Sequence, residues 1–268
     1  MERSGQLDEH FLRSLAANCG SAYVHGARAC GRPWRADDDL LLADLGLPLA
    51  LPPNSATVVR PPRGERAAQG IAERVEAFFS GSRGGGYEVW SIWPDLDLAP
   101  FGFLAGSAPC MVREPGGEPS RAPRELEIVE VDDDAGMREV WAVADAVFCE
   151  HLAPEPAWDA RILAEDYRVW LGRADGRPVA TATAFVGHGF VGVYAVATLE
   201  VARGRGYGEA VTWAATLCRP DLPATLQASE MGKPVYERMG YRTATTFTVW
   251  QADRRQVTSV APSSPRRG

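Results

Sequence analysis

Residues 196–211 read VATLEVARGRGYGEAV and contain the feature on which the fold assignment depends. An apolar, β-branched run precedes three alternating glycines, Gly204, Gly206 and Gly208, and a run of helix-forming residues follows them. Glycine lets a backbone approach a ligand that a side chain would keep away, and the start of a helix presents unpaired N–H groups. The pattern therefore predicts a strand, a glycine turn and a helix that together bind an anion.

The spacing of the glycines argues against two common phosphate-binding motifs. The P-loop requires a lysine directly after its last glycine, and the only lysine of the chain, Lys233, lies elsewhere. The dinucleotide fingerprint requires a third small residue where Glu209 stands, and it belongs to the first strand–helix unit of a domain. A tight turn that binds no ligand remains the alternative interpretation.

The order of elements around the turn predicts a mixed α/β domain built on one sheet. Apolar periodicity and turn residues predict strands over 126–132, 167–174, 177–187, 189–199, 224–229 and 241–250, and helices over 133–152, 208–218 and 233–240. Asp175-Gly176 is a strong signal for a hairpin turn between the second and third of these strands. The predicted order is β-α-β-β-β-α-β-α-β.

Breaks in composition divide the chain. A stretch rich in proline and glycine without aliphatic side chains predicts a linker over 114–124, between an N-terminal α/β domain at 1–113 and a second domain at 125–252. Residues 253–268 are expected to form a disordered tail. The first domain has a predicted helix over 70–81 and a strand over 87–93. Gly102 and Gly240 each precede an aromatic residue and a closing strand, which leaves coincidence and a degenerate internal repeat both open.

Arg203-x-x-Gly206-x-Gly208 resembles the signature of the GCN5-related N-acetyltransferases, and so do the element order of 125–252 and the spacing from Tyr236 to Gly240. The resemblance implies that this fold occupies the second domain, preceded by a smaller, degenerate copy. It implies acetyl-CoA as co-substrate, with its pyrophosphate on backbone N–H groups at the helix start and its pantetheine arm along the strand at Val196 and Thr198. The contacts it assigns are Val196, Ala197, Thr198, Arg203, Gly204, Arg205, Gly206, Tyr207, Gly208, Glu209 and Ser229.

The same resemblance implies a catalytic role for Tyr236, whose phenol would hydrogen-bond the departing sulfur. Ser229 stands where many members carry asparagine, and the strand before the turn has no carboxylate to act as a base. His188 is the candidate base, against the alternative of a structural histidine in a turn. Glu150 and His151 are weaker candidates, and an acceptor amine of low pKa would need no protein base.

The expected reaction is direct acetyl transfer from acetyl-CoA to a primary amine in a ternary complex. The acceptor is a small molecule or a peptide. Trp90, Trp93, Asp95 and Asp97 would form an amine pocket, or the tryptophans are simply core residues. The alternatives to the enzyme are a non-catalytic acyl-CoA sensor and a nucleotide-binding protein.

Net charge and cysteine content limit the partners. The formal net charge of −7 argues against a general binder of nucleic acid or of anionic membranes. Five scattered cysteines without a CxxC pair indicate reduced thiols in a cytoplasmic protein, and we expect no metal. The start of the chain does not resemble a signal peptide, no apolar run is long enough to span a membrane, and a homodimer is left open.

Overall fold

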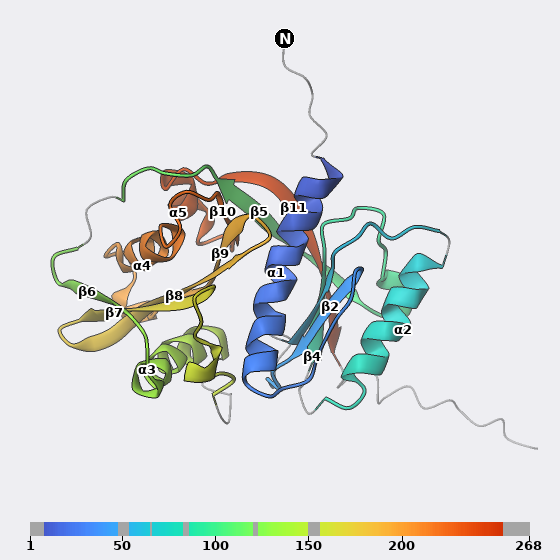
Figure 1. The fold of residues 1–268 in the computed structure, drawn as a ribbon, viewed down its shortest axis with the longest axis horizontal. Helices are drawn as coiled ribbons and strands as arrows, with labels where there is room; N and C mark the ends of the chain where they lie inside the picture. The colour runs from blue at the N-terminus through green and yellow to red at the C-terminus, as the bar shows by residue number, and fades with distance from the viewer. Residues whose placement is uncertain are drawn as a thin grey trace, which may run out of the picture.

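The computed structural model describes residues 8–47, 54–64, 66–82, 86–119, 123–149 and 156–253. All eleven described strands join one sheet, in the order β1-β2-β3-β4-β11-β5-β10-β9-β8-β7-β6 (Figure 1). The strands are β1 (Trp34–Ala36), β2 (Leu40–Asp44), β3 (Asn54–Val58), β4 (Gly86–Ser91), β5 (Leu104–Arg113), β6 (Leu126–Glu130), β7 (Tyr167–Ala174), β8 (Arg177–Gly187), β9 (Phe190–Thr198), β10 (Ala224–Gln227) and β11 (Arg242–Asp253).

Helices cover both faces of this sheet. In the second half, Trp170 of β7 packs in the apolar cluster that contains α4, while its neighbours Val169 and Leu171 pack in the cluster of α3. The two helices therefore lie on opposite faces, as Figure 1 shows. The helices are α1 (Glu9–Ala29), α2 (Ala67–Phe79), α3 (Asp134–Ala144), α4 (Tyr207–Thr216) and α5 (Lys233–Arg238), with short turns η1 (Ala99–Phe101), η2 (Asp145–Cys149), η3 (Ala160–Ile162) and η4 (Glu200–Ala202).

The elements predicted for the second half are confirmed, with one difference at the end of its first helix. Asp175 (φ 50°) and Gly176 (φ 72°) form the expected hairpin turn between β7 and β8. The predicted helix over 133–152 ends earlier, because α3 passes into η2, a single π-helical turn. Such turns displace the side chains that follow a helix, and η2 here contains Phe148 and Cys149.

The longest helix, α1, was not among the predicted elements. It lies across the middle of the sheet and contacts β2 and β3 of the first half and β8 and β9 of the second (Figure 1). A Cβ on Gly20 would lie 2.8 Å from both Leu41 Cδ1 and Thr57 Cβ, so glycine is what allows this helix to lie so close to the sheet. No helix in the described part of the chain is long and apolar enough to cross a membrane.

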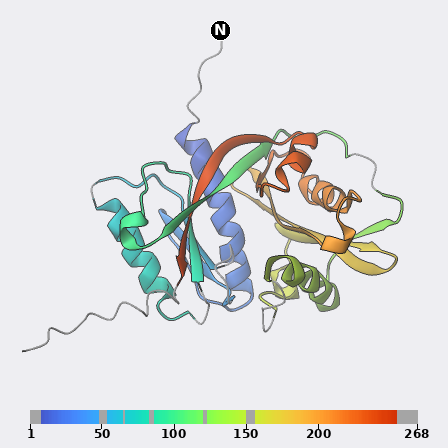
Figure 2. The ribbon, with the colours of Figure 1, turned by 180° about the vertical axis from the view of Figure 1, so that it is seen from behind.

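The two halves exchange their closing strands. β5 leaves the first half to pair with β10, and β11 leaves the second half to pair with β4, so that β5 and β11 lie antiparallel side by side (Figure 2). The strand directions on the two sides of this central pair are the same. In each half three antiparallel strands, β1–β2–β3 or β7–β8–β9, are followed by one parallel pair, β3–β4 or β9–β10. Gly102 and Gly240 precede the two exchanged strands, which favours the internal repeat over coincidence.

The boundaries of the two domains stay a prediction, because both halves are built into the same sheet. The predicted linker contributes a contact from Gly116, whose N–H donates to the carbonyl of Pro220 at 2.9 Å. Residues 120–122 of the linker and 254–268 of the predicted tail lie outside the described residues.

Candidate functional site

The glycine turn starts α4 without a side-chain cap. Gly204 (φ 77°) and Gly206 (φ 80°) adopt the left-handed conformation that favours glycine, and Gly206 is the N-cap residue of the helix. No side chain caps the first turn of this ten-residue helix. Its backbone N–H groups and the positive end of its dipole are therefore available to an anion.

Close contact between β9 and α4 explains the third glycine. A Cβ on Gly208 would lie 2.7 Å from the Thr198 Oγ1 atom, inside any normal contact distance. The end of β9 and the start of α4 thus approach each other through Thr198 and Gly208. The sequence motif therefore serves both the turn and this contact.

The strand that leads into the turn separates from its parallel neighbour. β9 and β10 pair at Val191 with Ala224 and at Gly192 with Thr225, whereas the equivalent β3 and β4 pair over four positions. The register of β9 with β8 shifts between Thr181 and Thr183, and Ala195 has a φ of 49°, which together mark a bulge.

Beyond the bulge, the backbone of β9 faces this gap. The N–H of Leu199 donates to the carbonyl of Val179 on β8 at 3.0 Å. Because peptide groups alternate along a strand, the N–H groups of Val196 and Thr198 point away from β8 and into the gap. The separation gives an extended ligand one free strand edge to pair with.

The gap opens into a cavity of about 550 Å³, which we call the glycine-turn cavity. Most of the predicted contacts line it: Val196, Thr198, Arg203, Gly204, Gly206, Tyr207, Gly208, Glu209, Ser229 and Tyr236. Ala197 and Arg205 are not among its described lining residues. Arg203 is exposed, and its Nε donates to the carbonyl of Thr198 at 3.4 Å.

Arg238 on α5 also lines this cavity and was missed by the sequence analysis. Its guanidinium lies 3.6 Å from the Glu209 carboxylate, which stands in the first turn of α4. The arginine therefore offsets a negative charge where an anion would bind. Its position two residues before Gly240, in the predicted helix that carries Tyr236, was the only signal available in the sequence.

Tyr236 stands between the glycine-turn cavity and a second cavity. Burial of its ring raises the pKa of the phenol to about 12, so the hydroxyl keeps its proton. Ser229, which lines both cavities, accepts a hydrogen bond from the Gly232 N–H at 3.1 Å and holds the loop before α5. Phe148 and Val196 line both cavities as well. These four side chains mark the junction where a group could pass from one cavity to the other.

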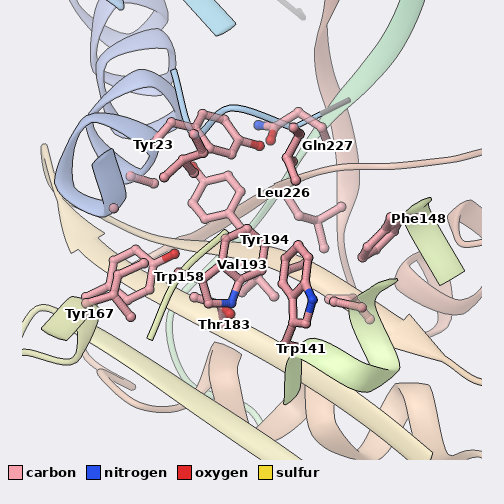
Figure 3. Close-up of a pocket in the computed structure, with 18 of the residues that line it drawn as sticks. Tyr23, Trp141, Phe148, Trp158, Tyr167, Thr183, Val193, Tyr194, Leu226 and Gln227 are labelled. Atoms are coloured by element: carbon pink, nitrogen blue, oxygen red, sulfur yellow. The ribbon is translucent and has the colours of Figure 1, made fainter. Parts of the chain in front are cut away.

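The second cavity, which we call the aromatic cavity, has a volume of about 230 Å³ and lies between the two halves. Rings from α1, β4, α3, η2, β9 and the loop before η3 form its walls. Prominent among them are Tyr23, Trp90, Trp141, Phe148, Trp158 and Tyr194. Figure 3 shows most of these rings, with Tyr23, Trp141, Phe148, Trp158 and Tyr194 labelled. Trp90 is buried and lines this cavity, whereas Asp95 and Asp97 are exposed and Trp93 is a core residue that donates to the Val58 carbonyl.

His188 does not reach either cavity. It occupies the turn between β8 and β9, at the opposite end of β9 from the glycine turn, with a φ of 53°. Its Nε2 lies 2.9 Å from Ser21 Oγ on α1. The structure therefore gives no support to His188 as the base. Glu150 and His151 lie outside the described residues. Within the described ranges, no cluster of three His, Cys, Asp or Glu side chains is placed to hold a metal ion.

Solved structures with the same fold span both halves of the chain. A GCN5-related N-acetyltransferase from Kribbella flavida is 21% identical, with a TM-score of 0.64 over 89% of this chain and 95% of that one. One from Sphaerobacter thermophilus is 13% identical, with a TM-score of 0.54 over 90% and 93% of the two chains.

A third similar structure, a putative acetyltransferase from Novosphingobium aromaticivorans, is 19% identical, with a TM-score of 0.53 over 86% and 94%. No family model and no curated protein matches the sequence. The fold implied by the glycine turn is therefore confirmed, and the chain has the fold of the GCN5-related N-acetyltransferases over both of its halves.

Proposed function

We propose that this protein is an acyl-CoA-dependent N-acetyltransferase that transfers an acetyl group from acetyl-CoA to a primary amine. The position of Tyr236 is the main support, because its protonated phenol stands at the junction of two cavities of different character. One cavity has the uncapped start of a helix and suits an anion. The other is apolar and suits an acceptor.

The glycine-turn cavity fits coenzyme A by its donor set. Pyrophosphate oxygens need several N–H donors and little side-chain bulk, and the start of α4 offers both at Gly206 and Gly208. The pantetheine amides need a free strand edge, and β9 offers one at Val196 and Thr198. Arg238 adds positive charge at the same cavity. When bound, acetyl-CoA supplies an acetyl group activated as a thioester.

The residues at the junction supply the remaining requirements of the transfer. The N–H of Val196 donates to the carbonyl oxygen as that oxygen gains negative charge. As the C–N bond forms and the C–S bond breaks, the Tyr236 hydroxyl gives its proton to the sulfur. The resulting phenolate then takes up the proton that the amine nitrogen loses. The apolar walls on the acceptor side keep the amine in its neutral, nucleophilic form.

Direct transfer is favoured over a covalent acyl-enzyme. Cys149 is the thiol that lines the aromatic cavity, and burial, the largest effect, raises its pKa to about 11 with Asp145 acting in the same direction. The thiolate needed for nucleophilic attack is therefore scarce at neutral pH. We expect sequential kinetics, and we expect Cys149→Ala to retain turnover.

Release of free thiol from acetyl-CoA in the presence of an amine panel tests this proposal. Tyr236→Phe should lower kcat by about 10²-fold, which is the scale of general acid catalysis, with little change in coenzyme A affinity. Tyr241→Phe is the matched control, because its ring packs 6.1 Å from that of Tyr236 while its hydroxyl bonds Thr216 at 2.7 Å. This control should keep kcat and lose about 1 kcal/mol of stability.

Two results would contradict the proposal that the protein is an acetyltransferase. Tight coenzyme A binding without turnover on any amine would instead indicate an acyl-CoA sensor. A rise in melting temperature with ATP or NAD, and none with coenzyme A, would indicate a nucleotide-binding protein.

A further inference from the structure

We propose that the acceptor is a primary amine with an uncharged aromatic body, and that this body occupies the aromatic cavity. The inference rests on the proposed acetyl transfer. The junction formed by Phe148, Val196, Ser229 and Tyr236 is the common wall of the two cavities. An amine that reacts at this junction must therefore place the rest of its structure in the aromatic cavity.

The size of the cavity suits a ring system with a short side arm. A dry cavity of about 150 Å³ in another protein binds benzene, and the aromatic cavity has about 230 Å³. This space accommodates a bicyclic ring or one ring with a short chain. It is too small for an oligosaccharide or for a folded peptide segment, so these acceptors would leave most of their structure outside.

The walls favour a ring over an alkyl chain. Trp141 and Trp158 meet edge to face with ring centroids 4.9 Å apart, and Tyr23 and Tyr194 lie at 5.9 Å on the other side (Figure 3). Aromatic side chains arranged in this way offer both faces and edges to a further ring, and each such pair contributes about 0.5–1.5 kcal/mol beyond simple burial.

The hydroxyl groups in the walls add polar selectivity. Tyr23 and Tyr167 have no hydrogen bond to another described residue through their phenol oxygens, and burial raises the pKa of both phenols. They stay protonated and can bind a hydroxyl, ether or ring nitrogen on the ligand. An alkyl chain in the same place would leave these hydroxyls unpaired and dry, which costs free energy.

The described walls of the aromatic cavity carry no charged side chain to bind a polycation or an amino acid. Among the described lining residues none is Asp, Glu, Lys, Arg or His. The buried carboxylate of Glu88, two residues from Trp90, accepts hydrogen bonds from Trp90 Nε1 at 2.9 Å and from Gln251 Nε2 at 3.1 Å. Because its oxygens are engaged, a second ammonium group would enter this cavity without a counter-charge, and a carboxylate would do the same.

The experiment compares acceptors of three chemical classes by thiol release from acetyl-CoA. Tryptamine and 4-methoxyaniline represent the proposed class, hexylamine the apolar aliphatic amines, and spermidine and kanamycin the polycations. We expect kcat/KM for the aromatic amines to exceed that of each other class by at least about tenfold. Preferential turnover of hexylamine or of a polycation would overturn the inference while leaving the acetyltransferase intact.

Binding measurements separate this inference from the proposed function. Calorimetric titration of tryptamine into the protein saturated with coenzyme A should show one site, whether or not turnover occurs. Turnover without measurable aromatic selectivity or binding contradicts the inference alone. Octanoyl-CoA tests whether the aromatic cavity instead holds the acyl chain of the donor. If it is used faster than acetyl-CoA and competes with tryptamine, the cavity holds an acyl chain and the inference is wrong.

Two variants with a matched control locate the effect. Trp158→Leu should raise the KM for tryptamine by about tenfold and leave the KM for acetyl-CoA unchanged. Trp34→Leu removes a tryptophan on β1 that is 42% exposed and lines neither cavity, and it should change neither constant. Tyr23→Phe removes one wall hydroxyl with little risk to folding. This variant should lower the affinity for 5-hydroxytryptamine more than the affinity for tryptamine. An equal loss of affinity for both amines would contradict the hydrogen-bonding role of the Tyr23 hydroxyl.

Discussion

Replacing Gly208 with alanine tests the glycine turn most directly, because the structure fixes what the added methyl group meets. The new Cβ would lie 2.7 Å from Thr198 Oγ1, where ordinary contacts begin at 3.4 Å. Either the end of β9 or the start of α4 must move, and overpacking of this kind costs about 1–3 kcal/mol. Both residues line the glycine-turn cavity, so the displacement occurs at the proposed anion site.

The expected result is weaker coenzyme A binding together with a modest loss of stability. If about 1.4–2.8 kcal/mol of the strain is expressed in the bound state, the Kd rises by about 10–100-fold. Calorimetric titration measures the affinity, and urea denaturation measures the free energy of unfolding.

A double-mutant cycle with Thr198→Ala isolates the contact. Alanine at 198 removes Oγ1, and the next Thr198 atom, Cβ, lies 3.9 Å from the added methyl group. The double variant should therefore recover most of the affinity that Gly208→Ala loses, with a coupling energy of about 1–3 kcal/mol. Wild-type affinity in Gly208→Ala, or a loss that Thr198→Ala does not relieve, would refute the reasoning.

Three further predictions concern the backbone and the buried polar groups. Gly204→Ala should cost about 1–2 kcal/mol through its positive φ and also weaken coenzyme A, whereas Gly176→Ala, with a similar φ of 72°, should cost the same stability and leave binding unchanged. Equal binding in the two variants would contradict this. Tyr194→Phe leaves Asn18 Oδ1 without the hydroxyl that donates to it at 2.6 Å and should cost about 1–2 kcal/mol in urea denaturation, so a loss under 0.5 kcal/mol, roughly the noise of surface changes, would be inconsistent. Burial raises the pKa of several tyrosines and cysteines, that of Cys110 to about 11, so the unfolded chain loses protons that the native state keeps. The free energy of unfolding should therefore fall as pH rises above about 9, by about 1.4 kcal/mol per pH unit for each retained proton. The melting temperature should fall with it, and a flat profile to about pH 10.5 would contradict the prediction.

The sequence was most informative where local chemistry decides the structure. Gly206 and Gly208 could be placed at a strand-to-helix turn because glycine at those positions has a local physical reason, and the structure confirms both the turn and the fold around it. Asp175-Gly176 likewise predicted its own hairpin. Periodicity of three or four residues sufficed for α4.

The parts that were not predicted depend on contacts between residues far apart in sequence. The helix α1 contains Gly20 and small residues whose value is close packing against β2 and β3, which no local pattern shows. The partners of β5 and β11 are set by an exchange between the halves, so strand pairing could not be read from chain order. The aromatic cavity draws on both halves and η2, and Trp141 and Trp158 carry no motif. His188 shows the limit of closeness in sequence. It directly precedes β9, but it lies at the end of that strand away from the glycine turn and contacts Ser21 instead.

The exchanged strands bear on how the chain folds during synthesis. β4 pairs on one side with β3 and on the other with β11, which follows all the other described strands in the chain. Until β11 emerges from the ribosome, the edge of β4 has no partner in the sheet, and an unpaired edge is a template for aggregation. Contacts of such long sequence separation also slow folding. We therefore expect the first half, expressed alone as residues 1–113, to be insoluble, and co-expression of residues 125–268 to rescue it.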